Sequence, residues 1–214
     1  WRSAPVPIRT TILASLGQIE LHLSVVGKNK GEATIALDCA TEELLTVLGK
    51  DLVSIDGARL EDVVGSLLCD RGYQVTVAES CTGGLVTSRL TDVPGSSAYV
   101  RAGWVVYSND AKVEILGIDR EIIEKHGAVS EPVARAMALQ ARARARVDYA
   151  IGVTGIAGPG GGSSEKPVGT VYLSLAGPED QLWDCRLNLP GERGRVKYQA
   201  SQAALDMLRR ALLE

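Results

Sequence analysis

A serine and a lysine lie in two separate segments that together could support nucleophilic catalysis. Ser80 follows the apolar, β-branched run 75–78, which predicts a buried strand, and precedes a glycine-containing turn into a predicted helix. Lys112 lies one helical turn after Tyr107, which ends a second apolar strand predicted over 103–107. A partly desolvated lysine has a lowered pKa and can accept a proton from a serine hydroxyl. We therefore predict a Ser80–Lys112 dyad, with Tyr107 as a relay or orienting group.

The four residues after Ser80 offer backbone N–H groups to an anion. Cys81, Thr82, Gly83 and Gly84 lie at the start of the predicted helix, where the first N–H groups have no intrahelical acceptor. We predict that these residues bind substrate and supply the oxyanion hole that acyl transfer needs. We also expect Thr82 to cap the helix while Ser80 reacts. Two alternatives stay open: Ser80 or Thr82 serves only as a cap, or a Cys81 thiolate is the nucleophile.

A third predicted strand, 149–153, ends in a long glycine-rich loop. Loops of this length and composition are usually functional or mobile. Its first residues, Thr154, Gly155, Ala157 and Gly158, are predicted to cradle a sugar or a phosphate.

The final predicted helix, 192–213, carries three basic residues near its start. Arg193, Arg195 and Lys197 place positive charge where the helix dipole is already positive, which is unfavourable. An anionic ligand would explain this placement. We predict that Arg193 neutralises a phosphate group.

The elements that must position these residues indicate an α/β fold. Their order is β–α–β–α–α–β–loop–β–β–α, with the last two strands predicted over 168–175 and 182–187. This order predicts a three-layer α/β/α sandwich with a mixed, mostly parallel sheet. In such sheets ligands bind beyond the carboxyl ends of the parallel strands, which is where the three polar clusters fall.

A separate small α+β unit is predicted ahead of this domain, and it shows no catalytic constellation. The predicted boundaries are 1–57 for this unit and 58–214 for the α/β domain. Within the small unit we expect a lead-in over 1–16, a strand over 18–25, a helix over 32–48 capped by Gly49, and a short strand over 52–55.

Composition narrows the classes of function. A net charge of −3 and a pI near 5.5 argue against a general nucleic-acid or anionic-membrane binder. The four cysteines are widely separated and there are only two histidines, so we expect neither a disulfide framework nor a metal site, and no cofactor. We recognise no signal peptide and no membrane-spanning run, so we expect a cytoplasmic protein. Because the first residue is Trp1, we expect a processed or truncated piece of a longer chain.

Seven segments, in collinear order, resemble the C-terminal domain of the CinA family. They are 78–84 (AESCTGG), 94–97 (PGSS), 103–112 (GWVVYSNDAK), 116–117 (LG), 126–138 (HGAVSEPVARAMA), 154–162 (TGIAGPGGG) and 166–171 (KPVGTV). That domain corresponds to the PncC-type nicotinamide mononucleotide amidohydrolases, and the resemblance covers about residues 59–213. It implies hydrolysis of nicotinamide mononucleotide to nicotinate mononucleotide and ammonia, in pyridine-nucleotide salvage.

The resemblance also implies roles for individual residues. Ser80 of AESCTGG would be the nucleophile, and Tyr107 and Lys112 of YSNDAK would activate it without a metal. The nucleotide-contacting positions of the family match Thr154, Gly155, Ala157, Gly158 and Arg193. Members of the family are expected to be homo-oligomers. Residues 1–57 resemble part of the KH-like middle domain of full-length CinA proteins, whose ADP-ribose pyrophosphatase domain has no counterpart in these residues.

Three classes of function remain at this point. The first is the amidohydrolase, and the second is a non-catalytic CinA-like domain that binds a nucleotide or a partner. The joint presence of Ser80, Tyr107 and Lys112 favours the enzyme, because binding alone requires neither a nucleophile nor a base. The third, nucleic-acid binding through the KH-like unit, is disfavoured because 1–57 shows no GXXG clamp flanked by basic residues.

Overall fold

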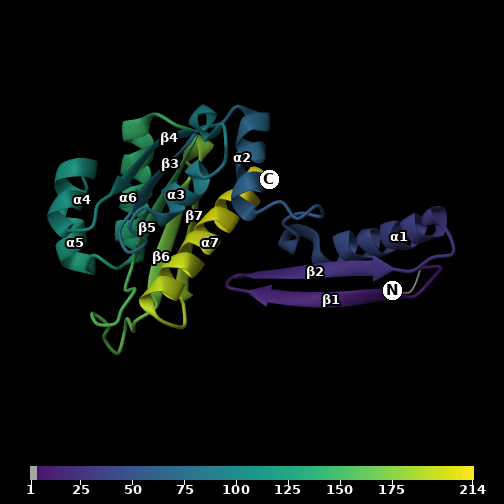
Figure 1. Cartoon of the computed structure of the whole chain (residues 1–214). Coiled ribbons are helices and arrows are strands. Elements are labelled where there is room, and N and C mark those ends of the chain that lie inside the picture. The colour runs from purple at the N-terminus through teal and green to yellow at the C-terminus, as the bar shows by residue number, and fades with distance from the viewer. Residues whose placement is uncertain (1–3) are drawn as a thin grey trace. The chain divides into compact units, whose positions relative to one another are not determined.

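The computed structural model describes residues 4–214, which divide into two compact units, one ending at Arg59 and the other comprising Leu60–Glu214 (Figure 1). The first unit is a β-hairpin with one long helix. β1 (Ile8–Ser15) pairs antiparallel with β2 (Gln18–Val25), and α1 (Lys30–Leu48) contacts β2. The helix ends at Gly49, as predicted, and a 3-10 turn, Gly49–Asp51, follows it.

Two predictions for this unit are wrong. The expected lead-in contains β1, although residues 1–3 lie outside the described part of the chain. β1 forms because alternate residues such as Ile8 and Ile12 lie opposite Val25 and Leu21 and share a face with them. The strand expected over 52–55 does not form, since in the described chain this stretch pairs with no neighbouring strand.

The second unit is an α/β sandwich. Its helices and strands are α2 (Leu60–Arg71), β3 (Val75–Glu79), α3 (Leu85–Thr91), β4 (Val100–Val105), α4 (Asn109–Leu116), α5 (Arg120–His126), α6 (Glu131–Ala145), β5 (Tyr149–Gly155), β6 (Thr170–Ala176), β7 (Leu182–Asn188) and α7 (Arg193–Leu212). Two 3-10 turns, Ser96–Ala98 and Pro178–Asp180, complete it. β4 overlaps the strand predicted over 103–107, but it begins before residue 103 and ends before residue 107. Its residues alternate between exposed and partly buried, as in an edge strand, so a continuous apolar run does not predict its ends.

The sheet has the order β4-β3-β5-β6-β7. β3 lies parallel to both β4 and β5, whereas β6 pairs antiparallel with β5 and β7. The predicted three-layer α/β class with a mixed sheet is therefore confirmed. Two pairs of neighbouring strands are parallel and two are antiparallel. Every residue of β3 is buried, as expected of a strand with neighbours on both sides and helices on both faces.

Helices cover both faces of the sheet. α6 packs against β3, β5 and β6 on one face, together with α4 and α5, around a core that includes Val106, Met137 and Ala150. The approach is close: a side chain at Gly152 of β5 would lie 2.2 Å from the carbonyl oxygen of Ala134 in α6. α2, α3 and α7 pack together on the opposite face, which α7 crosses in yellow in Figure 1.

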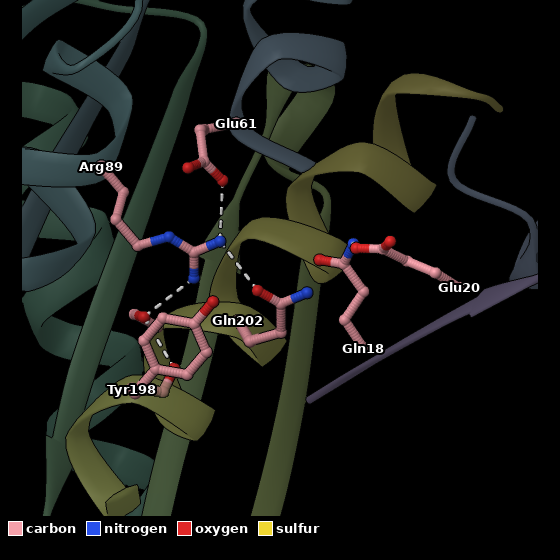
Figure 2. A network of polar contacts seen from close by, with 7 residues as sticks. Gln18, Glu20, Glu61, Arg89, Tyr198 and Gln202 are labelled. Carbon is pink, nitrogen blue, oxygen red and sulfur yellow. Dashed lines mark hydrogen bonds and ion pairs between the residues drawn. The ribbon is translucent and has the colours of Figure 1, made fainter. Parts of the chain in front are cut away.

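A buried polar network joins α2, α3 and α7 (Figure 2). The guanidinium of Arg89 in α3 donates to Glu61 Oε2 at 2.8 Å, Gln202 Oε1 at 2.7 Å and Ser201 Oγ at 3.0 Å. It also lies 5.1 Å from the ring centre of Tyr198. Because a buried charge needs such partners, this network fixes α3 against α7.

The described part of the chain contains no helix that is long and apolar enough to span a bilayer.

Candidate active site

The carboxyl ends of three parallel strands meet at one edge of the sheet. β3, β4 and β5 run in the same direction, and the hydrogen-bond ladder continues past the end of β3. The Ser80 amide donates to Val153 O at 2.9 Å, and the Val106 amide donates to Glu79 O at 2.8 Å. Ser80 and Tyr107, which follow β3 and β4, are therefore neighbours of Thr154, which lies near the end of β5.

The structure brings Ser80 and Lys112 together. Lys112 Nζ donates to Ser80 Oγ at 3.2 Å, and both side chains are buried, with Lys112 only 1% exposed. The same amine donates to the carbonyl oxygens of Val106 at 3.0 Å and Tyr107 at 3.4 Å. Lys112 lies in α4, whose N-cap Ser108 accepts from the Ala111 amide and so fixes the start of the helix.

Burial lowers the pKa of Lys112 from its ordinary 10.5, and a negative charge on Cys81 would act in the opposite direction. The three oxygens that the amine contacts are all neutral, so they compensate the loss of hydration only in part. A neutral lysine has a lone pair, which can accept the Ser80 proton across the same contact. The pair thus has the arrangement of a nucleophile and its base.

Cys81 is held as a buried thiol. Burial raises its pKa to about 12; the backbone N–H groups of Cys81 and Thr82 act in the opposite direction. Its sulfur packs against Gly155, where a Cβ would lie 3.0 Å from Sγ. A thiol that keeps its proton at neutral pH is a poor nucleophile, so its burial, together with the contact between Lys112 and Ser80, favours Ser80 over Cys81.

The predicted cap of α3 is wrong, and sequence reasoning missed the residue that caps it. The hydroxyl of Thr82 is buried and has no hydrogen-bond partner among the described residues. The Glu79 carboxylate instead accepts from the amides of Gly84, Val86 and Thr87. The signal was present in the sequence: an acidic residue that ends a buried strand must find donors nearby.

This cap reduces the number of free N–H groups beside Ser80. The Gly84 amide donates to Glu79, and the Gly83 amide donates to Ser80 O at 3.2 Å. Within residues 4–214, the amides of Cys81 and Thr82 donate to no backbone oxygen. The predicted anion site over four residues is therefore reduced to two amides next to the serine.

The loop after β5 is less available to a ligand than predicted. Thr154 and Gly155 belong to β5, which extends past the predicted strand 149–153. Thr154 is buried and its hydroxyl donates to Ala128 O at 2.8 Å, which ties the end of β5 to the turn before α6. A Cβ at Gly155 would lie 2.8 Å from Thr170 O, and Ala157 is only 5% exposed. Gly158, with φ of 82°, turns its carbonyl oxygen to Arg193 at 2.9 Å.

Arg193 connects two of the strand ends. It donates to Gly158 O and, at 2.7 Å, to the hydroxyl of Tyr107, which is 58% exposed. The predicted relay role of the Tyr107 hydroxyl is not supported, because its hydrogen bond is to Arg193 and not to the dyad. Tyr107 orients Lys112 through its backbone carbonyl instead.

Lys197 reaches the third strand end. A Cβ built on Gly83 would lie 3.5 Å from Lys197 Nζ, which places this amine beside the serine turn. Arg193 and Lys197 are four residues apart on α7 and so share a face of the helix. Residues 4–214 hold no group of three or more His, Cys, Asp or Glu that could bind a metal ion.

Comparison with known families identifies this domain. The family described as the CinA C-terminal domain matches residues 57–212. The chain belongs to the CinA family. A CinA-like protein of Acidobacterium capsulatum is 46% identical over 206 residues, which cover 96% of this chain and 50% of that protein. A CinA-like protein of Synechocystis is 45% identical, over 93% of this chain and 48% of the relative. The chain thus spans about half the length of the curated relatives it matches.

Solved structures of CinA proteins share the fold. The competence/damage inducible protein CihA of Agrobacterium tumefaciens is 40% identical with a TM-score of 0.69, over 75% of this chain and 99% of that one. The competence damage-inducible protein A of Klebsiella pneumoniae is 34% identical with a TM-score of 0.70, over 72% and 96%.

Proposed function

We propose that the second unit hydrolyses the carboxamide of nicotinamide mononucleotide, giving nicotinate mononucleotide and ammonia. The observation that carries the proposal is the 3.2 Å contact between Lys112 Nζ and Ser80 Oγ, made inside the protein by a lysine whose other contacts are neutral carbonyl oxygens. Membership of the CinA family supports it. The substrate follows from the resemblance of seven motifs to the PncC-type amidohydrolases.

In the first half of the reaction, Ser80 attacks the amide carbon. Neutral Lys112 takes the serine proton as the C–O bond forms, and the carbonyl oxygen becomes an oxyanion. The amides of Cys81 and Thr82 are the nearest donors for that oxyanion, because the next two are already used within the turn. When the C–N bond breaks, the protonated lysine returns the proton to the departing nitrogen, which leaves as ammonia.

In the second half, water cleaves the acyl-serine. Lys112, neutral again, takes a proton from water as the hydroxyl group adds to the acyl carbon. Collapse of this second oxyanion breaks the bond to Ser80 Oγ, and the lysine returns the proton to the serine. The product is a carboxylic acid, which ionises at neutral pH, and the enzyme is restored.

The phosphate of the substrate would meet the basic face of α7. Arg193 and Lys197 lie at the positive end of the helix dipole and four residues apart, an arrangement that is unfavourable without an anion. Arg193 already spans the ends of β4 and β5 through Tyr107 and Gly158. A phosphate near these cations would place the rest of the nucleotide beside Ser80.

Ammonia release from nicotinamide mononucleotide tests the proposal directly. Wild type should release it, whereas Ser80→Ala and Lys112→Ala should each lose at least about a thousandfold in kcat, since either change removes the dyad. Cys81→Ala should stay within about threefold of wild type, because a buried thiol takes no part.

Full activity in Ser80→Ala would contradict the mechanism. If wild type binds the nucleotide in calorimetry but releases no ammonia, the non-catalytic binding domain is the better description of this chain.

A further inference from the structure

We propose that Glu79 is a positioning residue for Ser80: its carboxylate fixes the turn 80–84, which carries the nucleophile and the two amides beside it. This inference rests on the proposed function, because it concerns the reactivity of Ser80. It goes beyond that proposal by assigning a role to a side chain that touches neither the dyad nor the substrate.

Both oxygens of the Glu79 carboxylate accept hydrogen bonds from groups of the protein. Glu79 Oε2 accepts from the Gly84 amide at 3.0 Å and the Val86 amide at 3.1 Å. Oε1 accepts from the Thr87 amide at 2.9 Å and the Thr87 hydroxyl at 2.8 Å. The side chain is 0% exposed. Four donors to a buried carboxylate form a strong, charge-assisted set, which holds the start of α3 against the end of β3.

The turn that contains Ser80 is held at both of its ends. Its first end is Glu79, whose backbone carbonyl accepts from the Val106 amide and belongs to the sheet. Its second end is Gly84, tied back to the Glu79 side chain. Gly83 and Gly84 have φ of 63° and 94°, a region that glycine adopts without strain, so the chain can reverse within this short ring.

A glycine in the neighbouring strand makes this arrangement possible. A Cβ at Gly103 of β4 would lie 2.5 Å from Thr87 Oγ1. Only a residue without a side chain therefore lets Thr87 reach Glu79 from between α3 and β4. The contacts that position the serine turn thus involve Glu79 of β3, Thr87 of α3 and Gly103 of β4.

Lys112 is held by contacts that do not involve the Glu79 carboxylate or the turn 80–84. Its amine is anchored by Val106 O and Tyr107 O, which follow β4. If the turn loosens, Ser80 moves while Lys112 stays, so the contact between Oγ and Nζ is what changes. A displacement of about 1 Å between reacting groups can lower a rate by roughly a hundredfold. The effect of Glu79 should therefore appear in the chemical step.

Glu79→Gln is the variant that separates this role from a purely structural cap. The glutamine keeps the shape, but an NH2 group replaces one acceptor oxygen and faces N–H donors. We expect kcat to fall about tenfold or more while KM stays within about twofold, because the basic residues of α7 are untouched. Ser201→Ala is the matched control, since it removes a buried hydrogen bond to Arg89 on the same side of the sheet without touching the turn.

A serine-directed fluorophosphonate supplies a readout that needs no nicotinamide substrate. Ser80 Oγ forms a bond to phosphorus, the P–F bond breaks, fluoride leaves, and the serine proton passes to Lys112. We expect mass spectrometry to find the label on Ser80, with a rate that falls in Glu79→Gln to the same degree as kcat, at a temperature where both proteins are folded. Ser201→Ala should label at the wild-type rate even if its melting temperature falls.

The outcomes are distinct. If wild type labels at Ser80 but releases no ammonia, the proposed substrate is wrong, and the labelling rates alone decide the role of Glu79. Wild-type labelling and turnover in Glu79→Gln would overturn the positioning role. So would a fall in kcat and labelling rate in Ser201→Ala that equals the fall in Glu79→Gln when both variants lose the same stability. A wild type that neither labels nor turns over would overturn both proposals together.

Discussion

Lys112 should make the proposed activity dependent on pH. The amine must be neutral to accept the serine proton, and burial lowers its pKa below the ordinary 10.5. We expect kcat/KM for nicotinamide mononucleotide to rise with pH along a limb whose midpoint lies below that value. Wild type is measured from pH 5 to 10 beside Cys81→Ala, which should show the same limb. A profile that is flat over this range would contradict a lysine base.

The same burial links Lys112 to stability. The unfolded chain keeps the lysine proton up to about pH 10.5, whereas the folded chain releases it at a lower pH. Between these two pKa values the unfolded state therefore binds more protons, and stability rises with pH. Lys112→Met removes this contribution, so its urea midpoint should rise less between pH 6 and 10 than that of wild type.

At the scale of single residues, the sequence predicted which side chains lie close together more reliably than it predicted their hydrogen-bond partners. The Ser80–Lys112 pair could be predicted because each follows a strand whose carboxyl end lies at the same edge. The cap by Glu79 was missed although its donors are nearby in the sequence, whereas the bond from Thr154 to Ala128 could not be predicted, because it joins two segments that only the fold brings together. A hydroxyl or carboxylate at the end of a strand has several possible partners, and only the assembled fold decides between them.

The start of α7 carries the charge that the proposed substrate requires. Lys197 lies beside Gly83, whereas Arg195, two residues earlier, is exposed and points away from that position on the helix surface. Lys197→Met should raise KM for nicotinamide mononucleotide about tenfold or more, with little change for the unphosphorylated riboside, because a phosphate contact is lost. Arg195→Met is the control and should leave both KM values near wild type. Equal losses on both substrates would argue against a phosphate contact.

Elements were predicted from the sequence where their periodicity was strong. β3, β5 and α7 lie within about two residues of the predicted ranges, because each is buried against the core. β1 was missed and 52–55 was predicted wrongly for one reason: a short alternating run becomes a strand only beside a partner strand. That partner is fixed by the fold of the unit rather than by the run itself.

At the scale of the whole molecule, the two units differ in what they contain. All residues of the candidate site belong to Leu60–Glu214, and the Agrobacterium structure is covered to 99% by a match to 75% of this chain. We therefore expect a chain of residues 60–214 to fold cooperatively in urea and to retain kcat within about threefold of the longer chain. Loss of cooperative unfolding in the short chain would show that it depends on the first unit. The KH-like assignment of that unit and the homo-oligomeric state stay predictions, and light scattering on the same samples measures the second.

The backbone of Ser80 belongs to the hydrogen-bond ladder of the sheet, because its amide donates to Val153 O and the carbonyl oxygen of its neighbour Glu79 accepts from the Val106 amide. The reactive oxygen is therefore attached to a part of the chain that opens only when the sheet opens, on the slow timescale of global unfolding. The loop over residues 159–166 pairs with no strand and is held instead by Lys166, whose amine donates to His126 O at 3.1 Å and to Val129 O at 2.8 Å. The serine turn and this loop are thus fixed by different contacts along one edge of the sheet, so substitutions in the loop can vary without displacing the Ser80 hydroxyl.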